Sequence, residues 1–138
     1  MAECCATETK LIYACSGASD VGEIADRVAR RLCEEGTADM SCLAGIGAGL
    51  SGYVQSAKGA DENITIDGCS VACAKKTLEK IGVTPTAYIL TDLGLVKDES
   101  PMTKETVKQI ADKIRRMKDT PAPPIQRGTG GCSCGGKC

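Results

Sequence analysis

Cysteine is the residue type through which this chain can do chemistry. The sequence contains ten cysteines and no histidine among its 138 residues. Thiolates bind soft metal ions and attack electrophiles, so a group of cysteines predicts either a metal site or a reactive thiol. The absence of histidine excludes Ser-His-Asp and Cys-His catalysis and every zinc site that mixes cysteine with histidine.

The segment IDGCSVACAKK, residues 66–76, carries the most informative spacing, because Cys69 and Cys73 are four residues apart. We expect a helix to start near Ser70, with successive side chains separated by about 100° around its axis. Cys69 and Cys73 then lie well away from the apolar stripe, so they are expected to be available to a ligand rather than packed in the core. The residues expected in that stripe are Val71, Ala74, Leu78 and Ile81.

Short apolar runs alternate with helical patterns four times along the chain. The runs occupy residues 10–15, 38–44, 63–68 and 86–93. This alternation is typical of α/β proteins, and it predicts a single three-layer domain in which a mostly parallel sheet of about four strands is flanked by helices.

Helix-terminus signals support this assignment. The first helix is expected over 21–35, with Asp20 and Glu23 forming a capping box and Gly36 ending it. The last helix is expected to start at Ser100, followed by Pro101 at its first position.

A glycine-rich stretch, GIGAGLSG, follows the second apolar run, and a weaker helical pattern spans residues 53–57. The stretch lacks the Lys-Ser/Thr ending of a phosphate-binding loop. Close backbone packing beside Cys42 is therefore the better interpretation.

Three cysteines fall at the carboxyl ends of expected strands: Cys15, Cys42 and Cys69. Ligands of open parallel sheets bind at this edge, so the three segments should converge on one site. Cys73 would add a fourth sulfur one helical turn later. Four thiolates favour zinc, with an iron-sulfur cluster or copper(I) as weaker candidates.

Three motifs together resemble a known family. CSGASDVGEIADRVARRL, MSCLAGIGAGLSG and IDGCSVACAKKTLEKIG are similar to the prokaryotic DGC-domain family, named for its Asp-Gly-Cys motif and described as zinc-binding proteins. The likeness covers roughly residues 10–115. It implies that Cys15, Cys42, Cys69 and Cys73 are the zinc ligands, and it supplies no reaction. Cys4-Cys5 and the C-terminal cysteines lie outside it.

Other residues near the motif have simpler expected roles. Asp67 is expected to hold the turn after the third strand through its carboxylate. Lys76 is expected on the side of the cysteines, where its positive charge would offset part of the negative charge of a tetrathiolate centre. Cys33, at the margin of the first helix's apolar stripe, is expected to be a small buried thiol.

The composition changes at Lys118 to a Pro-rich and then Gly-rich tail. We therefore expect a domain over residues 1–117 and a flexible tail over 118–138. The tail cysteines, Cys132, Cys134 and Cys138, are secondary candidates that could transfer a soft metal to the domain.

Charge and hydropathy argue against other partners. The net charge is −1 and there are three tyrosines with no Phe or Trp, so nucleic acid is not an expected partner. No apolar segment is long enough to span a bilayer, so neither a membrane partner nor a signal peptide is expected, and the expected location is the cytoplasm. Thiols stay reduced there, which favours metal or thiol chemistry over disulfides.

Three functions stay open at this point. The first is zinc binding for metal handling, sensing or structural support, because four thiolates fill a tetrahedral site and leave no position for a catalytic water. The alternative is a thiol oxidoreductase or sulfur-transfer enzyme that uses Cys69 as nucleophile with Cys73 as resolving thiol. The third is a regulatory module whose partner is recruited when metal binds.

Overall fold

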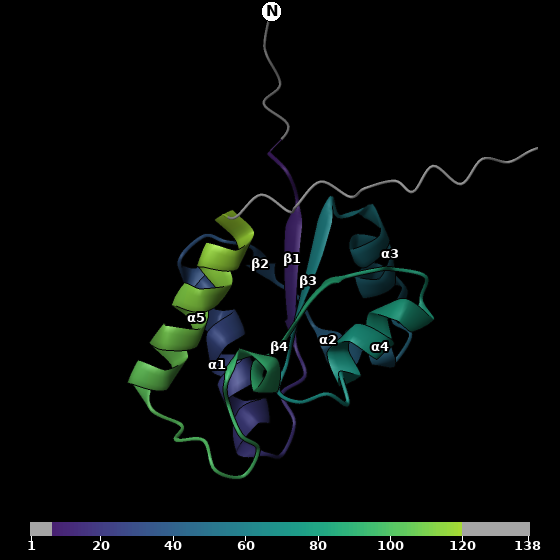
Figure 1. Cartoon of the computed structure of the whole chain (residues 1–138). Helices are drawn as coiled ribbons and strands as arrows, with labels where there is room; N and C mark the ends of the chain where they lie inside the picture. The colour runs from purple at the N-terminus through teal and green to yellow at the C-terminus, as the bar shows by residue number, and fades with distance from the viewer. Residues whose placement is uncertain (1–6, 120–138) are drawn as a thin grey trace, which may run out of the picture.

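A computed structural model of the chain describes residues 7–119, which form one four-stranded sheet with helices on both faces (Figure 1). All strand pairings are parallel, and the spatial order is β2-β1-β3-β4. The strands are β1 (Lys10–Ala14), β2 (Asp39–Met40), β3 (Glu62–Asp67) and β4 (Thr86–Ile89). The expected α/β class and parallel sheet are confirmed.

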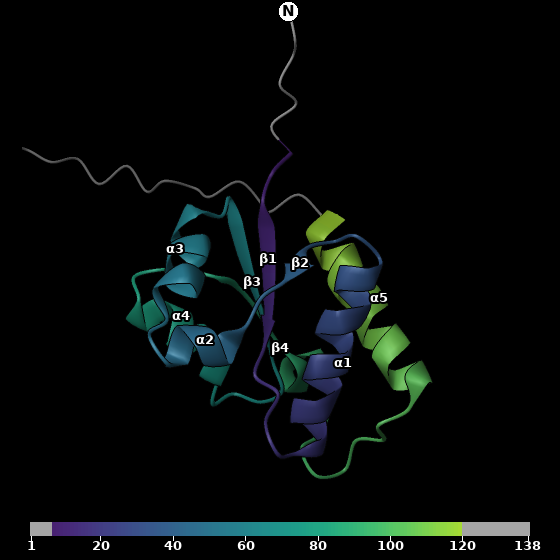
Figure 2. The same ribbon diagram turned by 180° about the vertical axis from the view of Figure 1, so that it is seen from behind.

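The helices divide into two outer layers. Helices α1 (Asp20–Glu34) and α5 (Lys104–Asp119) cover one face, and Figure 2 shows the other group on the opposite face. That second group comprises α2 (Leu43–Gly47), α3 (Ser51–Gly59) and α4 (Cys73–Lys80). A 3-10 helix, η1 (Leu90–Leu93), follows β4 directly.

Alternate side chains of the central strands fill two cores. Ile12 and Ile64 face α1 and α5, whereas Tyr13 faces α2, α3 and α4, because neighbouring residues of a strand point to opposite faces. All three side chains are fully buried. The sheet is therefore sandwiched between apolar helix faces, and its carboxyl edge carries the loops that bear the cysteines.

The first helix begins one residue earlier than its capping pattern suggests. Ser19 is the N-cap, and its hydroxyl accepts the N–H of Gly22 at 3.3 Å. The Asp20 carboxylate instead accepts backbone N–H groups of Asp98 and Ser100 from the segment before α5, both at 2.8 Å. These two bonds hold the pKa of Asp20 below its usual range. Gly36, with φ of 76°, follows the helix as expected.

Helix α4 begins at Cys73, not near Ser70, and this changes the position of Cys69. Cys69 lies in the turn before the helix, and Ala72 at the N-cap has a left-handed backbone with φ of 53°. Val71 is 54% exposed, so its expected place in the buried stripe was wrong. Ala74 and Leu78 are buried as expected.

Helix α5 also starts later than predicted, at Lys104. Thr103 accepts the N–H of Thr106 at 3.2 Å and takes the capping role expected of Ser100, whose hydroxyl donates to the Val96 carbonyl. The helix continues to Asp119, two residues past the expected end of the domain. Lys118 and Asp119, the first two residues of the expected flexible tail, are therefore helical, and the rest of that tail, residues 120–138, lies outside the described part of the chain.

The glycine-rich stretch and the weak pattern after it form helices α2 and α3. Gly45 of α2 packs directly against the ring of Tyr53, and a Cβ at Gly45 would overlap that ring. The expected close packing beside Cys42 is thus found at Gly45, whereas a Cβ at Gly47, Gly49 or Gly52 would meet nothing within 4 Å. Among residues 7–119, no helix is both long and apolar enough to cross a membrane.

Candidate functional site

The strand order puts a topological switch point between β1 and β3. The chain leaves β1 through α1 on one face, whereas the connection from β3 through α4 runs on the other face. The two loops therefore diverge at the carboxyl edge, where ligands of such sheets bind. Cys15 directly follows β1. Asp67 is the last residue of β3, and Gly68 and Cys69 come directly after it.

Cys15 is held against the loop that follows β3. Its backbone N–H donates to the Ile66 carbonyl at 3.1 Å, and its Sγ accepts the N–H of Gly68 at 3.4 Å. Gly68 also lies so close to α1 that a Cβ would be 2.7 Å from the carbonyl carbon and oxygen of Val21. Only glycine allows this approach, which brings the Cys15 sulfur beside the residue preceding Cys69.

The turn after Cys15 is anchored to the side of α1. Ser16 has a left-handed backbone with φ of 49°, and its hydroxyl donates to Asp26 Oδ1 at 2.9 Å. Arg30 Nε donates to the other oxygen of Asp26 at 2.7 Å. A non-glycine residue in this conformation requires surrounding contacts to hold it, and Asp26 supplies one. Ser16, Asp26 and Arg30 were not predicted from the sequence, although Asp26 and Arg30 have the i to i+4 spacing of an ion pair on one helix face.

Asp67 anchors α4 from the end of β3. Its buried carboxylate accepts the N–H of Ala74 at 2.8 Å and that of Lys75 at 3.1 Å. Burial raises the pKa of Asp67, while these two bonds and the nearby Lys76 oppose the rise. The carboxylate thus shapes the segment between strand and helix, which agrees with the turn role expected for it.

Cys42 and Cys73 occupy the neighbouring half of the same edge. Cys42 is the N-cap of α2, and its Sγ accepts the N–H of Gly45 at 3.4 Å. Helix α2 packs against α4, on which Cys73 is the first residue and Thr77 lies one turn later. Both thiols are exposed.

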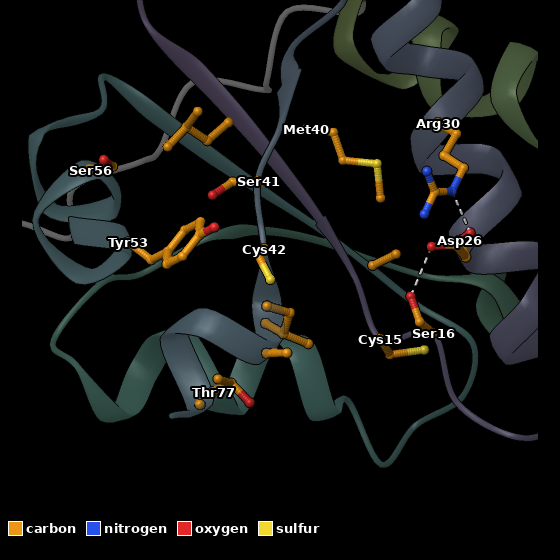
Figure 3. A pocket seen from close by; sticks show the side chains of 15 residues that line it. Cys15, Ser16, Asp26, Arg30, Met40, Ser41, Cys42, Tyr53, Ser56 and Thr77 are labelled. Carbon is orange, nitrogen blue, oxygen red and sulfur yellow. Dashed lines mark hydrogen bonds and ion pairs between the residues drawn. The ribbon is translucent and has the colours of Figure 1, made fainter. Parts of the chain in front are cut away.

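An open cavity of about 900 Å³ adjoins this half of the edge. Figure 3 shows Cys15, Ser16, Asp26 and Arg30 along one side and Cys42 in its middle, with Tyr53 on the far side. Thr77 of α4 also lines the cavity, and its hydroxyl donates to the Cys73 carbonyl at 2.7 Å. Cys15 and Cys42, two of the four predicted ligands, therefore line the cavity. Cys73 lies one helical turn before Thr77 and is not part of the lining.

The four thiols share an edge without forming a closed metal site. All four thiols are free. Cys15, Cys42 and Cys69 follow β1, β2 and β3 in turn, and Cys73 begins the helix after β3. Across residues 7–119, no three cysteine, aspartate or glutamate side chains gather closely enough to hold one ion. The donor chemistry fits zinc, but the side chains would have to move to surround it.

The remaining candidates lie apart from this group or outside the described range. Cys33 packs against the core beneath α1 as a half-buried side chain, rather than the buried thiol expected, because it lies at the margin of the helix's apolar stripe. Lys76 is exposed on α4 and acts electrostatically on Asp67. The tail candidates Cys132, Cys134 and Cys138 fall beyond the described residues.

The family profile of the DGC domain matches residues 11–114, which covers all four strands except the first residue of β1. This chain belongs to the DGC-domain family. The match includes Cys15, Cys42, Cys69, Cys73 and the Asp67-Gly68 pair. The resemblance carried by the three motifs is confirmed.

A curated relative of this DGC-domain protein is the "Anaerobic and virulence modulator AnvM" of Pseudomonas aeruginosa. The two are 39% identical over 88 residues, a segment that covers 63% of this chain and 67% of the relative. No solved structure matches the chain. The matching segment thus includes at least part of the edge on which the cysteines lie. The name of the relative describes a modulator.

Proposed function

We propose that this DGC-domain protein binds zinc reversibly through Cys15, Cys42, Cys69 and Cys73, and that it handles or senses the metal. The observation that carries the proposal is the placement of all four cysteine-bearing segments along the carboxyl edge of the sheet. Contact between Gly68 N–H and Cys15 Sγ at 3.4 Å links the β1 and β3 segments directly.

The donor set favours zinc over hard cations. Four thiolates suit a tetrahedral soft-metal site, whereas magnesium and calcium require oxygen ligands. Lys76 near the start of α4 would offset part of the negative charge of such a centre. Iron-sulfur clusters and copper(I) use the same ligand, so the metal must be identified chemically.

A structural role for the metal is less well supported than handling or sensing. Two apolar cores fill both faces of the sheet, and their largest side chains are fully buried. Zinc that is needed for folding supplies its binding energy in place of such a core. Here the thiols must also rearrange to bind, which lowers the affinity and favours exchange. The name of the Pseudomonas relative, a modulator, agrees with a responsive role.

The oxidoreductase alternative has weaker support. It requires the Cys69 or Cys73 thiolate to be stabilised by free N–H groups at the start of α4. The Asp67 carboxylate already accepts two of these, from Ala74 and Lys75. Cys69 also lies in the preceding turn rather than on the helix with Cys73.

The direct test is a zinc titration against a chromophoric chelator. It uses the full-length chain with Cys4, Cys5, Cys132, Cys134 and Cys138 changed to serine, so that the remaining cysteines are Cys33 and the four proposed ligands. We expect about one zinc per chain, and Cys69→Ser should weaken the affinity at least about 100-fold. Cys33→Ser is the matched control and should bind like its parent. Equal affinity of Cys69→Ser and Cys33→Ser would refute the assignment.

Circular dichroism separates reversible binding from a structural role. The metal-free protein should keep its helical signal and melt cooperatively after treatment with a strong chelator. Loss of the fold on chelation would overturn the handling or sensing role, and a brown, sulfide-containing preparation would replace zinc by a cluster.

A further inference from the structure

The cavity beside α1 and α2 holds polar groups that zinc binding does not use. Its volume of about 900 Å³ is that of a small-molecule site, and its walls combine apolar groups with a few polar ones. Arg30, Met40 and Cys42 follow one another across it in Figure 3. The chemistry of these three groups defines the ligand that the cavity would accept.

Cys42 is the reactive end of the cavity. Its thiol is exposed, whereas the Cys15 sulfur is half-buried and packed against the core. The N–H of Gly45 donates to the Cys42 sulfur at 3.4 Å and holds the thiol in place at the start of α2. A sulfur compound entering the cavity would therefore meet the Cys42 sulfur first.

Arg30 is the cationic end. Its Nε is occupied by Asp26, but neither Nη atom has a hydrogen-bond partner within residues 7–119. In Figure 3 these two nitrogens lie on the side of Met40, facing the interior of the cavity. Both oxygens of Asp26 already have donors, from Ser16 and Arg30, which leaves the guanidinium edge as the group that can bind a carboxylate.

We propose that this cavity binds low-molecular-weight thiols and disulfides that carry a carboxylate. The carboxylate is held by Arg30, the short carbon chain lies along Met40, and the sulfur meets Cys42. With a disulfide, the Cys42 thiolate attacks one ligand sulfur, a Cys42–ligand S–S bond forms and the ligand's own S–S bond breaks. The second half of the ligand leaves with the electron pair as a thiolate. The disulfide is the oxidant in this exchange, and the protein thiol is oxidised.

One consequence rests on the proposed zinc function. A mixed disulfide at Cys42 removes one of four metal ligands, so the state of the small-thiol pool would control zinc loading. The exchange itself needs no metal, because it uses only Cys42 and Arg30. Failure of zinc binding and failure of this proposal therefore give separate results.

The test compares two disulfides of similar length on the metal-free, full-length protein at low salt. Dithiodipropionate carries a carboxylate at each end, and hydroxyethyl disulfide is neutral. Peptide mass mapping gives the rate of mixed-disulfide formation at Cys42 for each probe. We expect Arg30→Gln to lower the ratio of the rate with dithiodipropionate to the rate with hydroxyethyl disulfide about threefold. This is the size of effect that one surface charge interaction produces.

Arg31→Gln is the matched control, because it removes the same charge from the neighbouring residue. The Arg31 side chain pairs with Glu35 and does not line the cavity. This substitution should leave the ratio unchanged. An unchanged ratio in Arg30→Gln would overturn the proposal, as would an equal fall in Arg31→Gln, which would show only a general effect of net charge. In about 0.5 M salt the wild-type ratio should fall toward that of Arg30→Gln, because screening weakens the carboxylate contact.

Discussion

The two halves of the sheet's carboxyl edge are built differently. In the half after β1 and β3, Cys15, Asp67 and Gly68 make hydrogen bonds or close contacts with backbone atoms of other segments. In the half after β2, Cys42 bonds only within its own helix start. No charged residue occurs from position 40 to position 57.

The contrast separates a fixed frame from an accessible surface. Backbone contacts hold the first half, and its motif residues Asp67 and Gly68 are both buried. The second half exposes Cys42 and covers Gly45 with a single ring, that of Tyr53. A metal site that spans both halves would close by movement of the second, since rigid scaffolds commonly position more mobile binding groups.

The largest effect should come from filling the contact between Gly68 and α1. In Gly68→Ala, the new Cβ would lie 2.7 Å from the Val21 carbonyl atoms and 2.9 Å from the Gly22 nitrogen. Backbone atoms of a packed helix cannot move aside cheaply, so we expect the free energy of unfolding to fall by about 3 kcal/mol. Urea denaturation measures the change.

Gly52→Ala is the control on the accessible half. Gly52 lies in α3, and a Cβ there would meet nothing within 4 Å. Alanine should stabilise the protein by about 0.5 kcal/mol, because glycine is the poorer helix former. If both substitutions had the same effect, the contrast between the two halves would be wrong.

Removing the Asp67 carboxylate should have the next largest effect. Asp67→Ala leaves the N–H groups of Ala74 and Lys75 without their acceptor at the start of α4. We expect a loss of about 2 kcal/mol in the free energy of unfolding, measured by urea denaturation. A loss below about 0.5 kcal/mol would show that α4 is held mainly by other contacts.

The pH dependence of stability should be smaller and has a defined sign. Burial raises the pKa of Asp67 above its ordinary value of 3.8, so the folded protein keeps this proton to higher pH than the unfolded chain does. Stability from this group therefore falls as pH rises from 3.8 through the folded-state pKa. The difference in unfolding free energy between wild type and Asp67→Asn should fall over that interval. A rising difference would mean that hydrogen bonding outweighs burial.

Among the substitutions that should destabilise the protein, the smallest loss is expected on the accessible half. Tyr53 is 42% exposed, and its ring covers Gly45. Tyr53→Ala should lower the free energy of unfolding by about 1 kcal/mol, because only part of the ring is buried. Thermal unfolding followed by circular dichroism tests this, and a loss as large as that of Gly68→Ala would show that both halves are equally rigid.

Local patterns predicted the architecture better than the helix boundaries. The four apolar runs and the stop at Gly36, which has positive φ, were readable because they depend on neighbouring residues. The start of α4 was not, because it depends on Asp67, which accepts an N–H seven residues later. Ser100 resembled a cap, but Thr103 took that role because Ser100 donates its N–H to Asp20 on the far side of the loop.

The sequence by itself determined an α/β domain of the DGC family with cysteines at the carboxyl ends of its strands. Apolar periodicity and motif spacing are local, so they could be seen without the fold. Only the tertiary structure decided that β1 lies between β2 and β3, because strand order depends on which long-range pairings bury the most apolar surface. That order brings the Gly68 N–H to the Cys15 sulfur and places Cys42 and Arg30 in the walls of one cavity, two arrangements that no spacing in the chain encodes.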